Sequence, residues 1–258
     1  MAVDPALVAL GTPIDEEQPW PRPICPTCAS GHLNFPEITT TQSAASLAEK
    51  GHPDWEPDWI EGSFRATGNC ENPHCRQTCL VAGSYQVQQA EAFWNEDRTW
   101  SGVCYSEYYS VDVVHPAPLV MPIPASAPES VQKGILRASR ALFPDPGLAA
   151  TALRSTVEGF LTAQGIENRT ASGGFRPLHT RLADWRKLGP SHDQVGNLFA
   201  AIQWLGNDGT HEDADLTVAA VMEGAAILDE AFHRWFTGPD LDAKATAIID
   251  ERGRARTT

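Results

Sequence analysis

The chain has 258 residues, enough for one large domain or two of ordinary size. It is 42% hydrophobic and 20% charged, as globular proteins are, and no segment approaches the roughly 18 consecutive apolar residues of a membrane span. Its formal net charge of −14 argues against broad, non-specific attraction to nucleic acid, which normally requires a basic surface. The first 20 residues contain no basic region and only a short apolar patch, so we expect no secretory signal and a cytoplasmic location.

Residues 1–115 are predicted to form a β-rich region. Segments 63–67, 78–88 and 101–114 are rich in β-branched and aromatic residues, with partial alternation of apolar and polar positions. The stretch "SAASLAEK" (43–50) indicates a short helix before them.

Six cysteines lie between residues 25 and 104, and none follows. In a chain without an export signal, clustered cysteines more often bind metal than form disulfides. In "CPTC" (25–28), two residues separate the cysteines, a spacing at which both thiolates of a tight turn reach one tetrahedral Zn²⁺. In "CENPHC" (70–75), Asn72-Pro73 supplies a turn between Cys70 and Cys75. We therefore predict a closed, structural zinc site with the ligands Cys25, Cys28, Cys70 and Cys75.

Two neighbouring residues compete for the fourth position of this site. His74 and Cys79 both lie within "HCRQTC" (74–79), and the 41 residues between the two pairs make a long insertion for a zinc ribbon. Cys79 begins a predicted strand and Cys104 lies within another, where a buried, apolar thiol is the more common outcome.

A proline-rich connector follows the β-rich region. Residues 116–128 favour extended backbone and cannot continue a helix or a central strand, because they contain Pro116, Pro118, Pro122, Pro124 and Pro128.

Residues 129–258 are predicted to form a helical bundle. Apolar residues recur at helical spacing in five segments, namely 128–143, 145–165, 178–190, 191–205 and a last one from about 215. Asp145 is the expected N-cap of the second segment, with Pro146 in its first turn, and Ser191 that of the fourth. We interpret the cationic stretch 175–187 as a solvated helix face rather than a nucleic-acid patch.

The stretch "WLGNDGTH" (204–211) has two interpretations. Gly206-Asn207 is a natural helix stop, because both residues tolerate left-handed backbone, and Asp208-Gly209 is a turn dipeptide. If the helix instead continued, Asn207 and His211 would share one face. We favour the helix stop.

The connector, "AATALRSTVEGFL" and "AIQWLGNDGTH" together resemble the bacterial family called domain of unknown function 4145, over about residues 115–237. Its helical part is similar to the HEPN superfamily, small bundles that include ribonucleases of toxin and phage-defence systems. The resemblance implies an α+β chain with a zinc-ribbon-like β region followed by a HEPN-like helical bundle, acting as a homodimer.

The resemblance also implies candidate catalytic residues. HEPN ribonucleases have an arginine, often followed by a polar residue, and a histidine four to six residues after the arginine. Asn207 and His211 match the last two positions, but Gly206 occupies that of the arginine, which Arg154 or Arg181 could replace from another helix.

Because the arginine is missing, we favour a non-catalytic function. We predict a zinc-containing binding or adaptor module with a protein or nucleic-acid partner, in phage defence or a restriction-like system. The alternatives are a metal-independent ribonuclease with a rearranged site, with Asn207, His211 and Arg154 as candidates, and a scaffold subunit of a complex. The sequence leaves open whether the chain is an enzyme.

Overall fold

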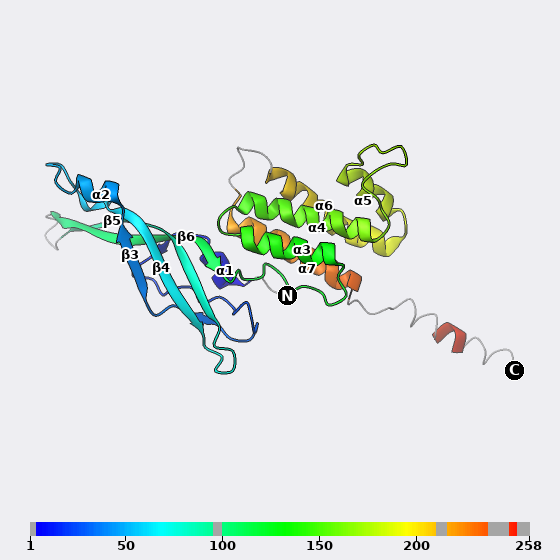
Figure 1. Cartoon of the computed structure of the whole chain (residues 1–258), viewed down its shortest axis with the longest axis horizontal. Coiled ribbons are helices and arrows are strands. Elements are labelled where there is room, and N and C mark those ends of the chain that lie inside the picture. The colour runs from blue at the N-terminus through cyan, green and yellow to red at the C-terminus, as the bar shows by residue number, and fades with distance from the viewer. Residues whose placement is uncertain (1–3, 95–99, 210–215, 237–247, 252–258) are drawn as a thin grey trace.

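The computed structural model describes residues 4–94, 100–209, 216–236 and 248–251. The protein is mixed α+β, with a long, curled antiparallel sheet in the first half of the chain and helices in the second (Figure 1). The predicted fold class is thereby confirmed at this level. Within the described ranges no helix is long and apolar enough to cross a membrane.

The sheet has six strands in the order β1-β6-β5-β4-β2, and β3 also pairs with β4. All three predicted strand segments are confirmed, within β4, β5 and β6. Alternate residues of β4 are buried, so one face of the sheet covers the core and the other faces solvent. The strands are β1 (Ile14–Asp15), β2 (Leu33–Asn34), β3 (Ile38–Gln42), β4 (Glu61–Cys70), β5 (Thr78–Trp94) and β6 (Trp100–His115).

Aromatic side chains fill the buried side of this sheet. Trp20 lies with its ring centroid 5.7 Å from those of both Phe64 and Tyr109. The short elements around the sheet are α1 (Pro5–Ala9), α2 (Ala44–Glu49) and the 3-10 helix η1 (Pro57–Trp59). The helix expected at 43–50 is thus α2, and the Ser43 hydroxyl caps it by accepting a hydrogen bond from the Ser46 amide.

Each of the five predicted helical segments contains a helix. They are α3 (Glu129–Ala141), α4 (Pro146–Ala163), α5 (Leu178–Arg186), α6 (Pro190–Asp208) and α7 (Val218–Phe236). Asp145 caps α4 as predicted, since its Oδ1 accepts a hydrogen bond from the Leu148 amide at 2.7 Å. The cap predicted at Ser191 is wrong, because α6 already begins at Pro190. The last helix starts at Val218, later than predicted, where the Thr217 hydroxyl accepts a hydrogen bond from the Ala220 amide.

Helix α4 packs against α3, α6 and α7. The wholly buried Phe160 of α4 has its ring centroid 5.2 Å from that of Phe199 on α6 and 5.5 Å from that of Phe232 on α7. These aromatic contacts join the three helices into one core.

The cationic stretch 175–187 is a solvated helix face only in part. Asp184 pairs with Arg176 at 2.6 Å and with Lys187 at 3.0 Å, as expected for surface charges. The prediction is wrong for Arg181, which is 2% exposed. Its guanidinium donates hydrogen bonds to the carbonyl oxygens of Glu158 and Ile166 and to the Thr162 hydroxyl. Arg181 therefore fastens α5 to the C-terminal end of α4.

Candidate metal centre

The first cysteine pair lies on a tight turn between Ile24 and His32, which form an isolated antiparallel bridge. The amide of Cys25 donates to the carbonyl of Gly31 at 2.8 Å, and the amide of Ala29 donates back to the carbonyl of Cys25 at 3.0 Å. The Gly31 amide donates to the Cys28 sulfur at 3.4 Å. These bonds aim both sulfur atoms toward the same side of the loop.

The second pair lies at the connection between β4 and β5. The Asn72 side chain accepts a hydrogen bond from the His74 amide at 3.0 Å, and its carbonyl accepts one from the Cys75 amide at 3.0 Å. The turn predicted at Asn72-Pro73 is therefore confirmed. The residue after the second cysteine is left-handed in both loops, with φ of 51° at Ala29 and 52° at Arg76. The chain thus leaves both loops, although they differ in length, through a left-handed residue.

Direct contacts hold the two loops together. The Thr27 hydroxyl donates to Gln77 Oε1 at 2.9 Å, and Asn72 Nδ2 donates to Ser30 Oγ at 3.2 Å. At Gly31 the loops approach so closely that a Cβ atom would lie 2.6 Å from the Cys70 sulfur. This position admits only glycine, because any side chain would displace a sulfur atom.

The four sulfur atoms form a compact cluster. All four lie within 4.8 Å of one another, with Cys28 Sγ 3.6 Å from Cys70 Sγ and Cys25 Sγ 3.8 Å from Cys75 Sγ. A Zn–S bond of about 2.3 Å in a tetrahedral site requires sulfur atoms about 3.8 Å apart. The structure therefore brings together the four predicted ligands at distances that suit one tetrahedral ion.

The thiol pKa values are spread widely within this cluster. Hydrogen bonds from the side chain and backbone of Ser30 lower the pKa of Cys28 to about 5. Burial, reinforced by the neighbouring sulfurs, raises the pKa of Cys70 to about 12. Cys28 is therefore readily ionised, whereas a thiolate at Cys70 needs a cation beside it. A bound metal ion would supply that cation.

The competing residues do not join the cluster. His74 is exposed, and the four-cysteine group found among the described residues does not include its ring. Cys79 is wholly buried, as expected of an apolar thiol, and burial raises its pKa to about 11. The same expectation is wrong for Cys104, which is exposed on β6.

The predicted helix stop at Gly206-Asn207 is also wrong, because α6 continues to Asp208 and Gly209 caps it in right-handed conformation. Gly206 is needed for close packing instead. A Cβ atom there would lie 2.4 Å from Arg154 Cβ and 3.1 Å from the Ala150 carbonyl oxygen, both on α4. The absence of a side chain at 206 lets α4 and α6 touch at this point.

That close approach brings two of the candidate catalytic residues together. Arg154 Nη1 donates to Asn207 Oδ1 at 2.7 Å, and Arg154 Nε lies 3.3 Å from Glu158 Oε1 without hydrogen-bond geometry. The Arg154 side chain is 27% exposed, so solvent still reaches it. His211 lies outside the described residues. Arg181 cannot replace the missing arginine, because its guanidinium is committed to the end of α4.

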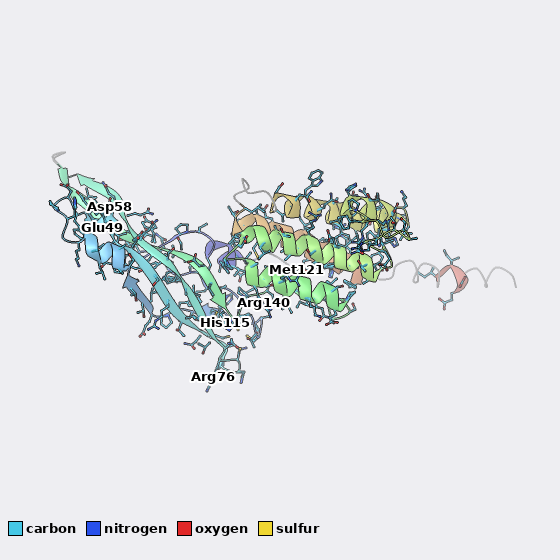
Figure 2. All side chains as sticks on the ribbon, turned by 45° about the horizontal axis from the view of Figure 1, so that its top comes forward. Glu49, Asp58, Arg76, His115, Met121 and Arg140 are labelled. Carbon is cyan, nitrogen blue, oxygen red and sulfur yellow. The ribbon has the colours of Figure 1, made fainter. Side chains whose placement is uncertain are left out.

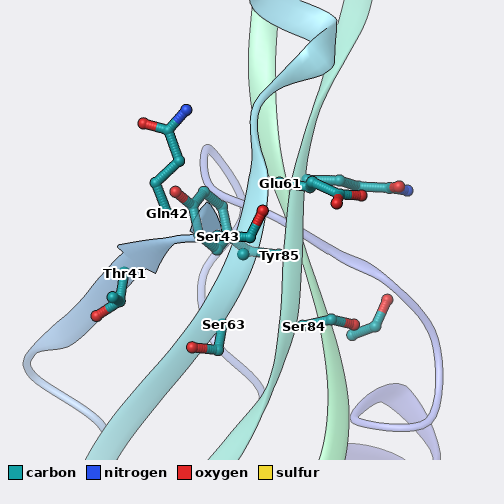
Figure 3. A pocket seen from close by; sticks show the side chains of 10 residues that line it. Thr41, Gln42, Ser43, Glu61, Ser63, Ser84 and Tyr85 are labelled. Carbon is teal, nitrogen blue, oxygen red and sulfur yellow. The ribbon is translucent and has the colours of Figure 1, made fainter. Parts of the chain in front are cut away.

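A row of hydroxyl groups crosses the solvent face of the sheet, which the sequence did not reveal. Thr41 pairs with Ser63, Ser63 with Ser84, and Ser84 with Ser110, on four adjacent strands. The row lines a polar hollow of about 530 Å³ (Figure 3). Because Glu61 is the only charged residue among the described residues of this lining, the hollow does not suit an anionic ligand.

The fold and the site define a mixed α+β protein with a four-cysteine candidate metal centre. Residues 136–252 match a family model, Domain of unknown function (DUF4145), and this part of the chain belongs to that family. A second model, Domain of unknown function (DUF8608), matches residues 15–111, which include the four cysteines. No curated protein and no solved structure matches the chain. The predicted family is therefore confirmed for the helices, and the β-rich part matches a second family that was not predicted.

Proposed function

We propose that the protein is a binding module whose four cysteines hold one structural Zn²⁺ ion. This proposal rests on two sulfur–sulfur distances, 3.6 Å between Cys28 and Cys70 and 3.8 Å between Cys25 and Cys75. Both are close to the separation of two thiolate ligands on one tetrahedral zinc ion. Four protein ligands fill a tetrahedral shell and leave no position for a substrate or a reactive water. The ion stabilises the fold and takes no part in chemistry.

A structural ion is physically needed where these loops meet. The pairing of β2 with β4 is only two residues long, and the loops that carry the cysteines have few apolar side chains. Metal–thiolate bonds replace the hydrophobic contacts that such loops cannot make. A reducing compartment keeps thiolates available for metal, and the proposal therefore includes a cytoplasmic location.

Metal analysis tests the proposal directly. The full-length chain, purified without added metal, is expected to contain about one zinc ion per chain. It is also expected to leave a labelled RNA of mixed sequence uncut. Inductively coupled plasma mass spectrometry and a denaturing gel measure these two properties. A folded chain without metal would contradict the structural zinc, and cleavage of RNA would contradict a non-catalytic module.

The contact between Arg154 and Asn207 favours a second candidate function, a metal-independent ribonuclease. Such a site needs a positive group for the charge that develops on the phosphate, and Arg154 offers one at the position next to Asn207. In this candidate His211 is the general base and Asn207 orients the substrate.

The ribonuclease candidate predicts that purified protein cleaves RNA in the presence of EDTA. Arg154→Ala and His211→Ala should each lower the cleavage rate at least about 100-fold, as removal of a transition-state donor or of a general base does. Arg186→Ala is the matched control, because Arg186 is bound to Asp193 at the surface of the same bundle. Equal cleavage by the unchanged protein and all three variants would identify a contaminating nuclease.

The remaining parts of the proposal come from the family resemblance alone. They are a homodimeric state and a role in phage defence or a restriction-like system. Light scattering of the zinc-loaded chain measures its molar mass in solution and so tests the homodimer.

A further inference from the structure

We propose that the exposed face of α3 is a docking surface for an acidic, amphipathic segment of a protein partner. This inference rests on the proposed binding function and names the chemical class of the partner. It is carried by four side chains, Lys133, Leu136, Arg137 and Arg140, which we call the α3 stripe.

The α3 stripe follows from helix geometry. Its members are separated by three, one and three residues, so they lie on one face of the helix. All four are exposed, whereas Val131, Ile135 and Ala138 on the opposite face are wholly buried. The main helix contact of α3 is with α4, which lies beside it in Figure 1, and the exposure of the four side chains places the stripe away from that contact. It is therefore open to a partner along its whole length.

The positive charge of the stripe is largely uncompensated. Lys133 pairs with Glu129 at 2.6 Å, but among the described residues neither Arg137 nor Arg140 has an ion pair or a side-chain hydrogen bond. Other arginines of the bundle are engaged, such as Arg176 with Asp184 and Arg234 with Glu230. Residues 113–144 contain only one acid, Glu129, although the chain as a whole has a net charge of −14. The stripe is thus a local basic surface on an acidic protein.

Figure 2 places Arg140 of α3 and His115 at the end of β6, both in the region where the sheet and the helices adjoin. The connector between β6 and α3 passes directly beside the helix, because the Val120 amide donates to the Ser139 hydroxyl at 3.2 Å. This connector carries no charged residue. One flank of the stripe is therefore neutral and largely apolar.

The exposed apolar side chains on and beside the stripe favour a protein partner over a nucleic acid. Leu136 is 37% exposed in the middle of the stripe, and Leu119 of the connector is 37% exposed. Such side chains add affinity for a segment that has its own apolar face, and add nothing for a phosphate backbone. Three cations are also few for nucleic-acid binding by a chain with a net charge of −14. Charge complementarity and exposed leucines together fit a segment in which acidic and apolar side chains alternate at helical spacing.

A peptide titration tests this surface. The probe is a fluorescein-labelled 18-residue peptide that contains only glutamate, leucine and alanine, with glutamate and leucine at helical spacing. Full-length, zinc-loaded protein should raise its fluorescence anisotropy. Arg137→Glu and Arg140→Glu should each weaken binding at least about tenfold, and Leu136→Ser about threefold.

The matched control is Arg65→Glu on β4. The Arg65 side chain is exposed and has no hydrogen bond or ion pair among the described residues. Its replacement by glutamate changes the net charge of the chain as much as Arg137→Glu does. This variant should bind the peptide as the unchanged protein does. Circular dichroism confirms that each variant is folded, which the exposure of the substituted side chains favours.

Four results would overturn the inference. They are absence of peptide binding, equal weakening by Arg65→Glu, tighter binding of a 20-nucleotide RNA than of the peptide, and a dimer that Arg137→Glu dissociates. The last result would make a second copy of this chain the partner. If the chain contains zinc and leaves RNA uncut but does not bind the peptide, the docking surface on α3 is refuted. The proposed function is not contradicted by that result.

Discussion

Replacing Cys70 by serine is expected to abolish stable zinc binding and to unfold the loops that carry the cysteines. Cys70 is 7% exposed, and its sulfur lies 3.6 Å from that of Cys28. A serine hydroxyl is a poor zinc ligand, so three thiolates remain and the tetrahedral shell opens. Structural Zn²⁺ contributes about 10–16 kcal/mol in small zinc peptides, and a loss of several kcal/mol in the free energy of unfolding is therefore expected here. Metal analysis and urea denaturation followed by circular dichroism measure the two effects.

Two other cysteines provide the controls. Cys104→Ser changes an exposed residue outside the cluster and should alter neither zinc content nor stability. Cys79→Ser places a hydroxyl at a wholly buried position, so it should lower stability by about 1–2 kcal/mol while zinc content stays the same. A Cys70→Ser protein that retains one tightly bound zinc would refute the four-cysteine site.

The clustering of the four cysteines could be predicted in part because each pair is a local pattern. Two cysteines on one turn must point to the same side, whatever the rest of the chain does. What joins the pairs is not local, since Cys70 meets Leu33 through the pairing of β2 with β4. The register of two strands and the contact between Gly31 and the Cys70 sulfur depend on tertiary packing. The sequence therefore indicates the candidate ligands, but it does not indicate the strand pairing and loop contacts that bring them together.

Two failures of prediction have different physical causes. Arg181 shares a helix face with Leu178, Leu182 and Trp185, so the periodicity already placed it inside. Its charge misled the prediction, because the carbonyl oxygens of Glu158 in α4 and of Ile166 just after it accept hydrogen bonds from the guanidinium in the core. Cys104 lies on a part of β6 where the buried positions end, so the apolar character of its strand does not imply burial there.

Substitution of Gly206 by alanine should destabilise the helical bundle by about 2–3 kcal/mol, although alanine favours helices over glycine. The added Cβ would lie 2.4 Å from Arg154 Cβ, a separation that forces α4 and α6 apart. Denaturation of the Gly206→Ala protein measures the loss. Gly165→Ala is unsuitable as a control because Gly165 has a φ of 80°. Gly159 also lies within a helix, but an added Cβ would lie 3.0 Å from its closest atom, Ser130 Cβ, and Gly159→Ala should cost less because this approach is less severe.

A double substitution separates this contact from a general intolerance of α6. In an Arg154→Gly background the two closest atoms, Arg154 Cβ and Cδ, are gone and only the Ala150 carbonyl oxygen remains at 3.1 Å, so Gly206→Ala should then cost clearly less stability. An unchanged cost in that background would refute the packing argument. The same logic explains why an arginine at 206 is excluded in this chain. Arg154 fills the space beside that position and directs its own guanidinium to Asn207, so the positive group next to Asn207 comes from α4 rather than from α6.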